Sequence, residues 1–83
     1  MTELNLLAVQ NAPIMRELIK GGADRPETIP ELARRIDRAP FSVTRSVKAV
    51  AADGLVDTSD LTLPDAGVEQ WEAIQRAEGG AGQ

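Results

Sequence analysis

Seven side chains in the middle of this chain carry groups that can bind an anion or donate hydrogen bonds to it. Four are guanidinium groups, one is an ammonium group and two are hydroxyls: Arg34, Arg35, Arg38, Ser42, Thr44, Arg45 and Lys48. Guanidinium and ammonium groups bind phosphate, and a guanidinium group can also form two hydrogen bonds with the edge of a guanine base. These residues therefore offer recognition by charge and hydrogen bonding.

The chain has few side chains that could catalyse the breaking of bonds. The chain has no Cys and no His, so it lacks thiolates, imidazole ligands for zinc and the side chain that usually transfers protons near neutral pH. Ser42 consequently has no His to activate it as a nucleophile. Asp57, Asp60 and Asp65 lie three and five residues apart around a turn without further ligands, which does not favour a metal site. We expect no enzymatic activity, no cofactor and no metal.

Charge is unevenly distributed along the chain. The formal net charge is -4, yet the stretch from Arg25 to Lys48 holds six basic and three acidic residues. That stretch carries +3, so the remainder carries -7. This distribution predicts one cationic face on an acidic protein. The simpler alternative, which the sequence leaves open, is that Arg34, Arg35 and Arg38 are solvated charges on a helix surface.

The 83 residues suffice for one small domain, which we place at residues 1–78, with 79–83 as a flexible tail. Phe41 and Trp71 are the only aromatic residues, so aliphatic side chains must form the core. We assign Trp71 to that core or to a dimer interface. The N-terminal residues show neither a basic leader nor an apolar run long enough for a membrane helix. These features predict a cytoplasmic protein.

Helix signals precede the basic stretch. Apolar residues at helical spacing predict a helix within 3–10, and Asn11 with Pro13 marks the start of a second helix that ends at Gly21-Gly22. A loop follows at 23–27. The second helix carries its apolar side chains on one face: Ile14, Met15, Leu18 and Ile19.

Two further helices must hold the candidate residues. Thr28 and Glu31 have the spacing of a capping box, which starts a helix that buries Leu32, Ala33 and Ile36. We expect Asp37 to end it in the left-handed conformation, and Pro40 to start a helix that runs to about Asp53 and is capped by Gly54. At about 100° per residue, Val43, Val47 and Val50 form a buried stripe. The opposite side then presents Phe41, Thr44, Arg45, Lys48 and Ala52.

Residues 55–63 predict a very short hairpin with a polar turn at 58–60, and Pro64-Asp65 opens a last helix with Val68, Trp71 and Ile74 facing inward. We therefore predict a mainly α, winged helix-turn-helix fold with about five helices and a two-stranded β-hairpin wing.

The run TIPELARRIDRAPFSVTRSVKAVAADGLV resembles the winged helix-turn-helix regulators of MarR and ArsR type from bacteria and archaea. Their pattern is a Leu-Ala pair, a Gly turn, Ser-Pro-x-x-Val-x-Arg and a Gly-Leu-Val exit. It corresponds here to Leu32-Ala33, Asp37, the run APFSVTR at 39–45, and Gly54-Leu55-Val56. QNAPIMRELIKGG is similar to the second helix of ArsR-like proteins, and LTLPDAG is similar to the strand and helix start that follow the wing in that family. The likeness spans roughly residues 10–75.

The resemblance implies a homodimeric, sequence-specific regulator that binds double-stranded DNA, joined through its terminal helices. It makes Ser42, Thr44, Arg45 and Lys48 the residues that face the major groove, and Arg34, Arg35 and Arg38 the contacts to the DNA backbone. The implied recognition helix spans about 40–53. Phe41 would either touch a thymine methyl group or a sugar, or pack against the preceding helix.

Several positions depart from the family pattern. Asp37 replaces the turn Gly, Arg38 stands where an apolar residue is usual, and Ala39 replaces a Ser cap. The short wing carries Asp57 and Asp60 in place of basic residues, so a contact with the minor groove is not expected from it. The acidic flanks support an alternative: a protein-binding winged-helix adaptor or antirepressor that modulates another DNA-binding protein.

Overall fold

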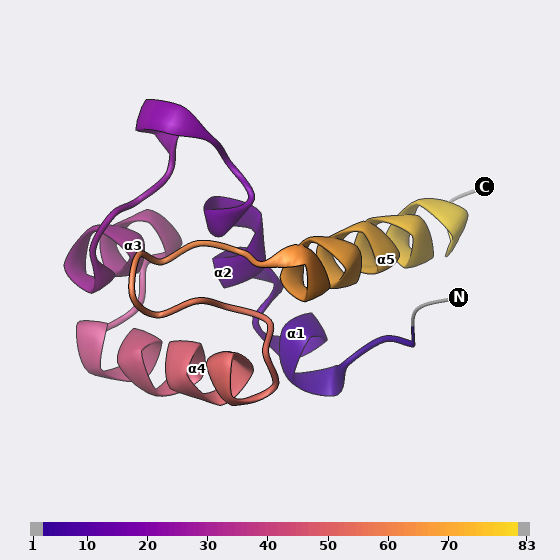
Figure 1. Cartoon of the computed structure of the whole chain (residues 1–83), viewed down its shortest axis with the longest axis horizontal. Coiled ribbons are helices and arrows are strands. Elements are labelled where there is room, and N and C mark those ends of the chain that lie inside the picture. Colours follow the sequence, from indigo (N-terminus) through magenta and orange to yellow (C-terminus); the bar gives the residue numbers. More distant parts are fainter. Residues whose placement is uncertain (1–2, 82–83) are drawn as a thin grey trace.

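The computed structural model describes residues 3–81 of the chain, which fold mainly as helices (Figure 1). Five α-helices and one short 3-10 helix lie in that range: α1 (Leu6–Gln10), α2 (Ala12–Leu18), the 3-10 helix (Gly22–Asp24), α3 (Ile29–Ile36), α4 (Pro40–Ala52) and α5 (Asp65–Ala81). The helical class and the number of helices are as predicted. Within the described range, none of the helices has the length and apolar character needed to span a membrane.

The start of α3 follows the predicted cap closely. The hydroxyl of Thr28 accepts a hydrogen bond of 3.3 Å from the amide of Glu31. The Glu31 carboxylate reaches back one residue further than in a standard capping box, and accepts from the amide of Glu27 at 3.2 Å. Asn11, in contrast, makes no cap bond for α2. Its side-chain amide donates instead to the carbonyl of Leu7, within α1, at 2.8 Å.

Asp37 adopts the left-handed conformation expected of it, with φ of 55°. The amide of Asp37 donates to Arg34 at 3.4 Å and that of Arg38 donates to Ala33 at 3.0 Å. This pair of hydrogen bonds is the Schellman motif, which satisfies the last carbonyls of a helix and usually places Gly at the left-handed position.

The end of α4 repeats the motif with the usual residue. Gly54 has φ of 77°, its amide donates to Ala51 at 2.9 Å, and the amide of Leu55 donates to Val50 at 3.1 Å. The C-terminal ends of α3 and α4 are thus closed by the same backbone geometry, once with Asp and once with Gly.

The core lies between α4 and the helices α1, α2 and α3. Val43, Val47 and Val50 are each at most 3% exposed, so the predicted valine stripe is confirmed. They pack in one apolar cluster with side chains from the other helices and the following loop, including Ala8, Ile14, Met15, Leu18, Leu32, Ala33, Leu55, Val56, Leu61 and Ile74. The stripe fixes the rotation of α4, which decides the side chains that face outward.

The predicted β-hairpin wing is wrong, because residues 3–81 contain no strand. Asp57 and Thr62 form a single bridge, in which each amide donates to the other residue's carbonyl at 2.8 and 3.2 Å. A strand would direct Leu55 and Val56 to opposite faces, but both are buried. Leu61 also turns into the core, with φ of 54°. Leu61 lies in the turn between the two bridged residues, so the pairing is limited to this one bridge.

Gly67 allows helix α5 to pack closely against the backbone of Leu55. A Cβ atom on Gly67 would lie 2.1 Å from the carbonyl oxygen of Leu55, so only glycine permits this approach. Of the three residues expected to face inward, Ile74 is buried, and Val68 and Trp71 are partly buried. The helix continues to Ala81, so residues 79–81 of the expected tail are helical and residues 82–83 lie outside the described range.

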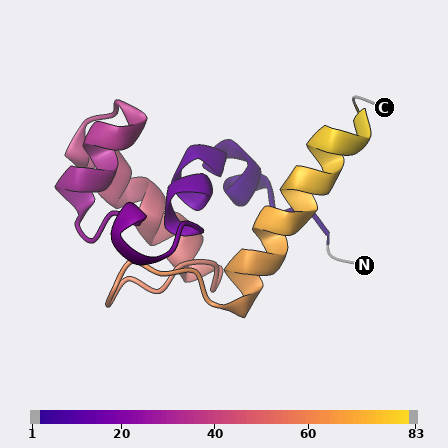
Figure 2. The ribbon, with the colours of Figure 1, turned by 90° about the horizontal axis from the view of Figure 1, so that it is seen from above.

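Gln70 holds the N-terminal segment against α5. Its Oε1 accepts a hydrogen bond of 3.0 Å from the amide of Asn5, and its Nε2 donates to the carbonyl of Glu3 at 2.6 Å. Figure 2 shows α5 on one side of α1 and α2, with the α3–α4 pair on the other side. Helix α5 therefore leaves the outer face of α4 uncovered.

Candidate nucleic-acid interface

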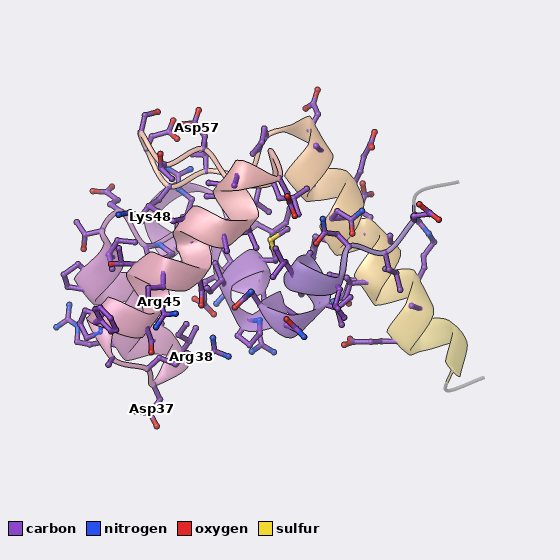
Figure 3. All side chains as sticks on the ribbon, turned by 90° about the horizontal axis from the view of Figure 1, so that it is seen from below. Asp37, Arg38, Arg45, Lys48 and Asp57 are labelled. Atoms are coloured by element: carbon purple, nitrogen blue, oxygen red, sulfur yellow. The ribbon has the colours of Figure 1, made fainter. Side chains whose placement is uncertain are left out.

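The outer face of α4 carries most of the candidate residues. Ser42, Arg45 and Lys48 are exposed and Thr44 is partly buried. In the view of Figure 3, Lys48, Arg45 and Arg38 follow one another along the α4 side of the molecule, with Asp57 beyond Lys48 and Asp37 beyond Arg38. A row of three cations thus runs along this face, with a carboxylate at each end.

Phe41 also belongs to this face. Phe41 is 70% exposed, so its ring is not buried against α3, which leaves the other alternative given by the sequence. The guanidinium carbon of Arg45, one turn later on α4, lies 5.7 Å from the centre of the ring. That distance is within the range of a cation–π contact.

The cations on this face form no ion pair with a carboxylate in the described part of the chain. Within residues 3–81, the ion pairs involve only Lys20 and Arg35 as cations, so Arg34, Arg38, Arg45 and Lys48 are not part of an ion pair. These four side chains need no competing bond broken before they meet an external anion.

Arg35 is placed differently from the other candidate residues. Its guanidinium group donates to the carboxylates of Glu17 at 3.3 Å and Glu31 at 3.0 Å, and also to the carbonyl of Asp24. Four of the seven predicted residues therefore lie on α4. Arg34 and Arg38 are exposed on α3 and in the turn after it, whereas Arg35 makes contacts within the protein.

Glu17 is a buried charged residue near the candidate site that its sequence pattern did not single out. It is buried, and it pairs with Lys20 at 3.1 Å as well as with Arg35. Burial by itself raises the pKa of Glu17, but the hydrogen bonds and charges of Lys20 and Arg35 outweigh it and hold the pKa below its ordinary value. Its position three residues after Ile14, on the apolar side of α2, was the available signal.

Two hollows flank α4. One, of about 260 Å³, is lined by Glu27, Thr28, Ile29, Thr44, Val47, Lys48 and residues 58–61. The other, of about 360 Å³, is lined by Leu7, Gln10, Asn11, Ser42, Arg45, Ser46 and Ala49. Helix α4 is therefore a ridge between two depressions, a shape that can enter the major groove of B-form DNA. The first hollow also brings carboxylates near Lys48, because Glu27 and Asp60 line it.

Comparison of the chain with protein-family models, with curated proteins and with solved structures finds no match. The resemblance to MarR and ArsR regulators therefore rests on the residues of the chain itself. Helices α3 and α4 pack against each other, and the outer face of α4 is uncovered.

Proposed function

We propose that this protein is a small helix-turn-helix regulator of the MarR and ArsR type that binds double-stranded DNA sequence-specifically, with α4 in the major groove. The observation that supports this most directly is the orientation of α4. Its valine stripe is buried at Val43, Val47 and Val50, while Arg45 and Lys48 face outward with no carboxylate bound to them.

Each exposed group has a role that its chemistry suits. Arg45, near the start of α4, contacts a guanine edge, and Lys48, almost one turn further, contacts a phosphate. Arg34 lies on the preceding helix and Arg38 in the turn, and both contact phosphates beside the major groove. Ser42 and Thr44 donate hydrogen bonds to phosphates or bases. Arg35 is left out of this set, because its guanidinium group already binds Glu17 and Glu31.

Without a β-hairpin wing, one copy offers only a short contact surface, which favours binding as a homodimer. Two copies of α4 about 34 Å apart would then contact successive turns of the major groove. Apolar side chains on and before α1 are exposed and available to such a pairing: Leu4, Leu6 and Val9. For a bacterial or archaeal regulator, the compartment that holds the DNA is the cytoplasm.

A second candidate, a protein-binding adaptor or antirepressor, is favoured by a different observation. Asp60 and Glu27 line the hollow beside Lys48, and Asp57 is exposed at the same end of α4. These carboxylates repel phosphate, and a protein partner with a basic surface would match them.

Fluorescence anisotropy with a duplex of random sequence, at two salt concentrations, tests the primary proposal. We expect the affinity to fall steeply with salt, because bound Lys and Arg side chains release counterions from DNA. Arg45→Ala should weaken binding to a selected site by about 1–3 kcal/mol, and Lys48→Ala should reduce the salt slope by about one. Arg76→Ala, on the exposed surface of α5, is the matched control and should change neither.

Absence of binding at low salt would contradict the proposal, and so would unchanged binding by the Arg45→Ala, Lys48→Ala double variant. If a pull-down then captures one stoichiometric protein partner, the adaptor function is supported. Sedimentation of the free protein and of the complex measures the number of copies bound.

A further inference from the structure

Phe41 is an unusual residue for an exposed position. It is one of two aromatic residues in the chain, and it lies in the first turn of α4 with 70% of its surface exposed. Large aromatic side chains contribute most when they are buried, so an exposed one next to an Arg is typical of a contact surface. The fold does not need the ring, because the core cluster is formed without it.

The contact between Phe41 and Arg45 gives the pair a defined geometry. The ring and the guanidinium group lie 5.7 Å apart on the same side of α4, one helical turn from each other. Stacking on the ring restrains the Arg45 side chain, so less conformational freedom is lost when the guanidinium group binds a base. An ordinary exposed arginine, such as Arg34, lacks a ring beneath it.

The major groove offers one apolar group to such a ring. Thymine presents its C5-methyl group there, and guanine presents the N7 and O6 acceptors that fit a guanidinium group. Neighbouring base pairs are about 3.4 Å apart along the helix axis. Two groups whose centres are 5.7 Å apart can therefore contact adjacent base pairs at the same time.

We propose that Phe41 and Arg45 together recognise a C5-methylated pyrimidine next to a guanine. Arg45 binds N7 and O6 of the guanine, and Phe41 covers the methyl group of the adjacent thymine. 5-Methylcytosine carries the same methyl group and satisfies the same contact. This inference rests on the proposed DNA binding and adds a determinant of specificity to it.

The experiment begins with selection of the tightest-binding duplexes from a random pool by the wild-type protein. We expect the selected sites to share a thymine adjacent to a guanine. Replacement of that thymine by deoxyuridine removes only the methyl group, and should weaken binding about fourfold, the effect expected for one buried methyl-sized group. Deoxyuridine at thymines elsewhere in the site is the matched control and should have no effect. 5-Methylcytosine at the critical position should bind better than cytosine.

Phe41→Ala should abolish the difference between thymine and deoxyuridine and keep the salt slope of the wild type. Because the ring is exposed, we expect this variant to keep the helical circular dichroism spectrum and unfolding temperature of the wild type. Selected sites without this step, or equal binding of thymine and deoxyuridine sites, would overturn the inference and leave DNA binding intact. A protein that selects no duplex at all overturns both proposals.

Discussion

The guanidinium group of Arg35 on α3 lies 3.3 Å from the carboxylate of Glu17 on α2 and joins two helices that brace α4. The Glu17 side chain is 10% exposed and that of Arg35 is 30% exposed, so this pair is more shielded from solvent than a usual surface ion pair. Arg35 therefore contributes to folding, although it follows directly after Arg34, which is free of ion pairs in the described structure.

Arg35→Ala should lower the free energy of unfolding by about 1–3 kcal/mol, because it leaves the buried Glu17 carboxylate with Lys20 as its remaining partner. Arg34→Ala is the matched control and should change stability by less than about 0.5 kcal/mol. Urea denaturation measures both. In DNA binding at a temperature where both variants are folded, the order should reverse, since Arg34→Ala removes a proposed phosphate contact. Equal stability of the two variants would contradict this structural role of Arg35.

Stability should fall in acid partly through Glu17. The folded protein holds the pKa of this residue below its ordinary value of 4.5, so the contribution to stability is complete above that value. It is lost as the pH falls through the lower pKa of the folded state, where the carboxylate becomes protonated. Unfolding free energies measured across this range should decline with a shallower slope in Glu17→Gln. An unchanged slope would show that the pair with Arg35 does not set the acid sensitivity.

Gly67→Ala should be severely destabilising, by about 3 kcal/mol or more, because the new Cβ atom would lie 2.1 Å from the Leu55 carbonyl oxygen. The backbone at Gly67 or at Leu55 must then move. Gly79→Ala, in the same helix, has no atom within 4 Å of the new Cβ atom and should stabilise α5 by up to about 1 kcal/mol. Thermal unfolding distinguishes the two variants, and similar unfolding temperatures would contradict this packing.

Asp37 and Gly54 allow a reciprocal test of the left-handed helix ends. Asp37→Gly should raise the free energy of unfolding by about 0.5–1 kcal/mol, because Gly adopts φ of 55° without strain. Gly54→Ala should lower the free energy of unfolding by about 1–2 kcal/mol, because Ala is strained at φ of 77°. No atom lies within 4 Å of the new Cβ atom, so this backbone strain is the whole expected effect. Chemical denaturation measures both changes. A loss of stability in Asp37→Gly would mean that the Asp side chain makes a contact worth more than the relief of strain.

The parts of the fold predictable from sequence depend on neighbours along the chain. The Thr28 cap, the left-handed Asp37 and the valine stripe of α4 each follow from residues a few positions apart, whose geometry is fixed within a helix or turn. The exposed face of α4 followed from the same periodicity, which is why most candidate residues lie where they were expected.

The incorrect or missing parts depend on tertiary contacts. Two short segments around a polar turn at 58–60 suggested a hairpin at 55–63, but only Asp57 and Thr62 pair, and Leu55, Val56 and Leu61 are all buried in the core. The bonds of Glu17 with Arg35 and of Gln70 with Asn5 join residues 18 and 65 positions apart. A polar residue at the edge of an apolar face gives no indication of which distant partner it will meet.

The hydrogen bond between Gln70 and Asn5 also bears on the order in which parts of the fold can form during synthesis. The segment that holds Asn5 is synthesised well before Gln70, because 65 positions separate the two residues. The partners of α4 on α2 and α3 are all made before α4 itself, so α4 can settle onto them while synthesis continues. The amide of Asn5 must wait for α5 before its hydrogen bond to Gln70 can form.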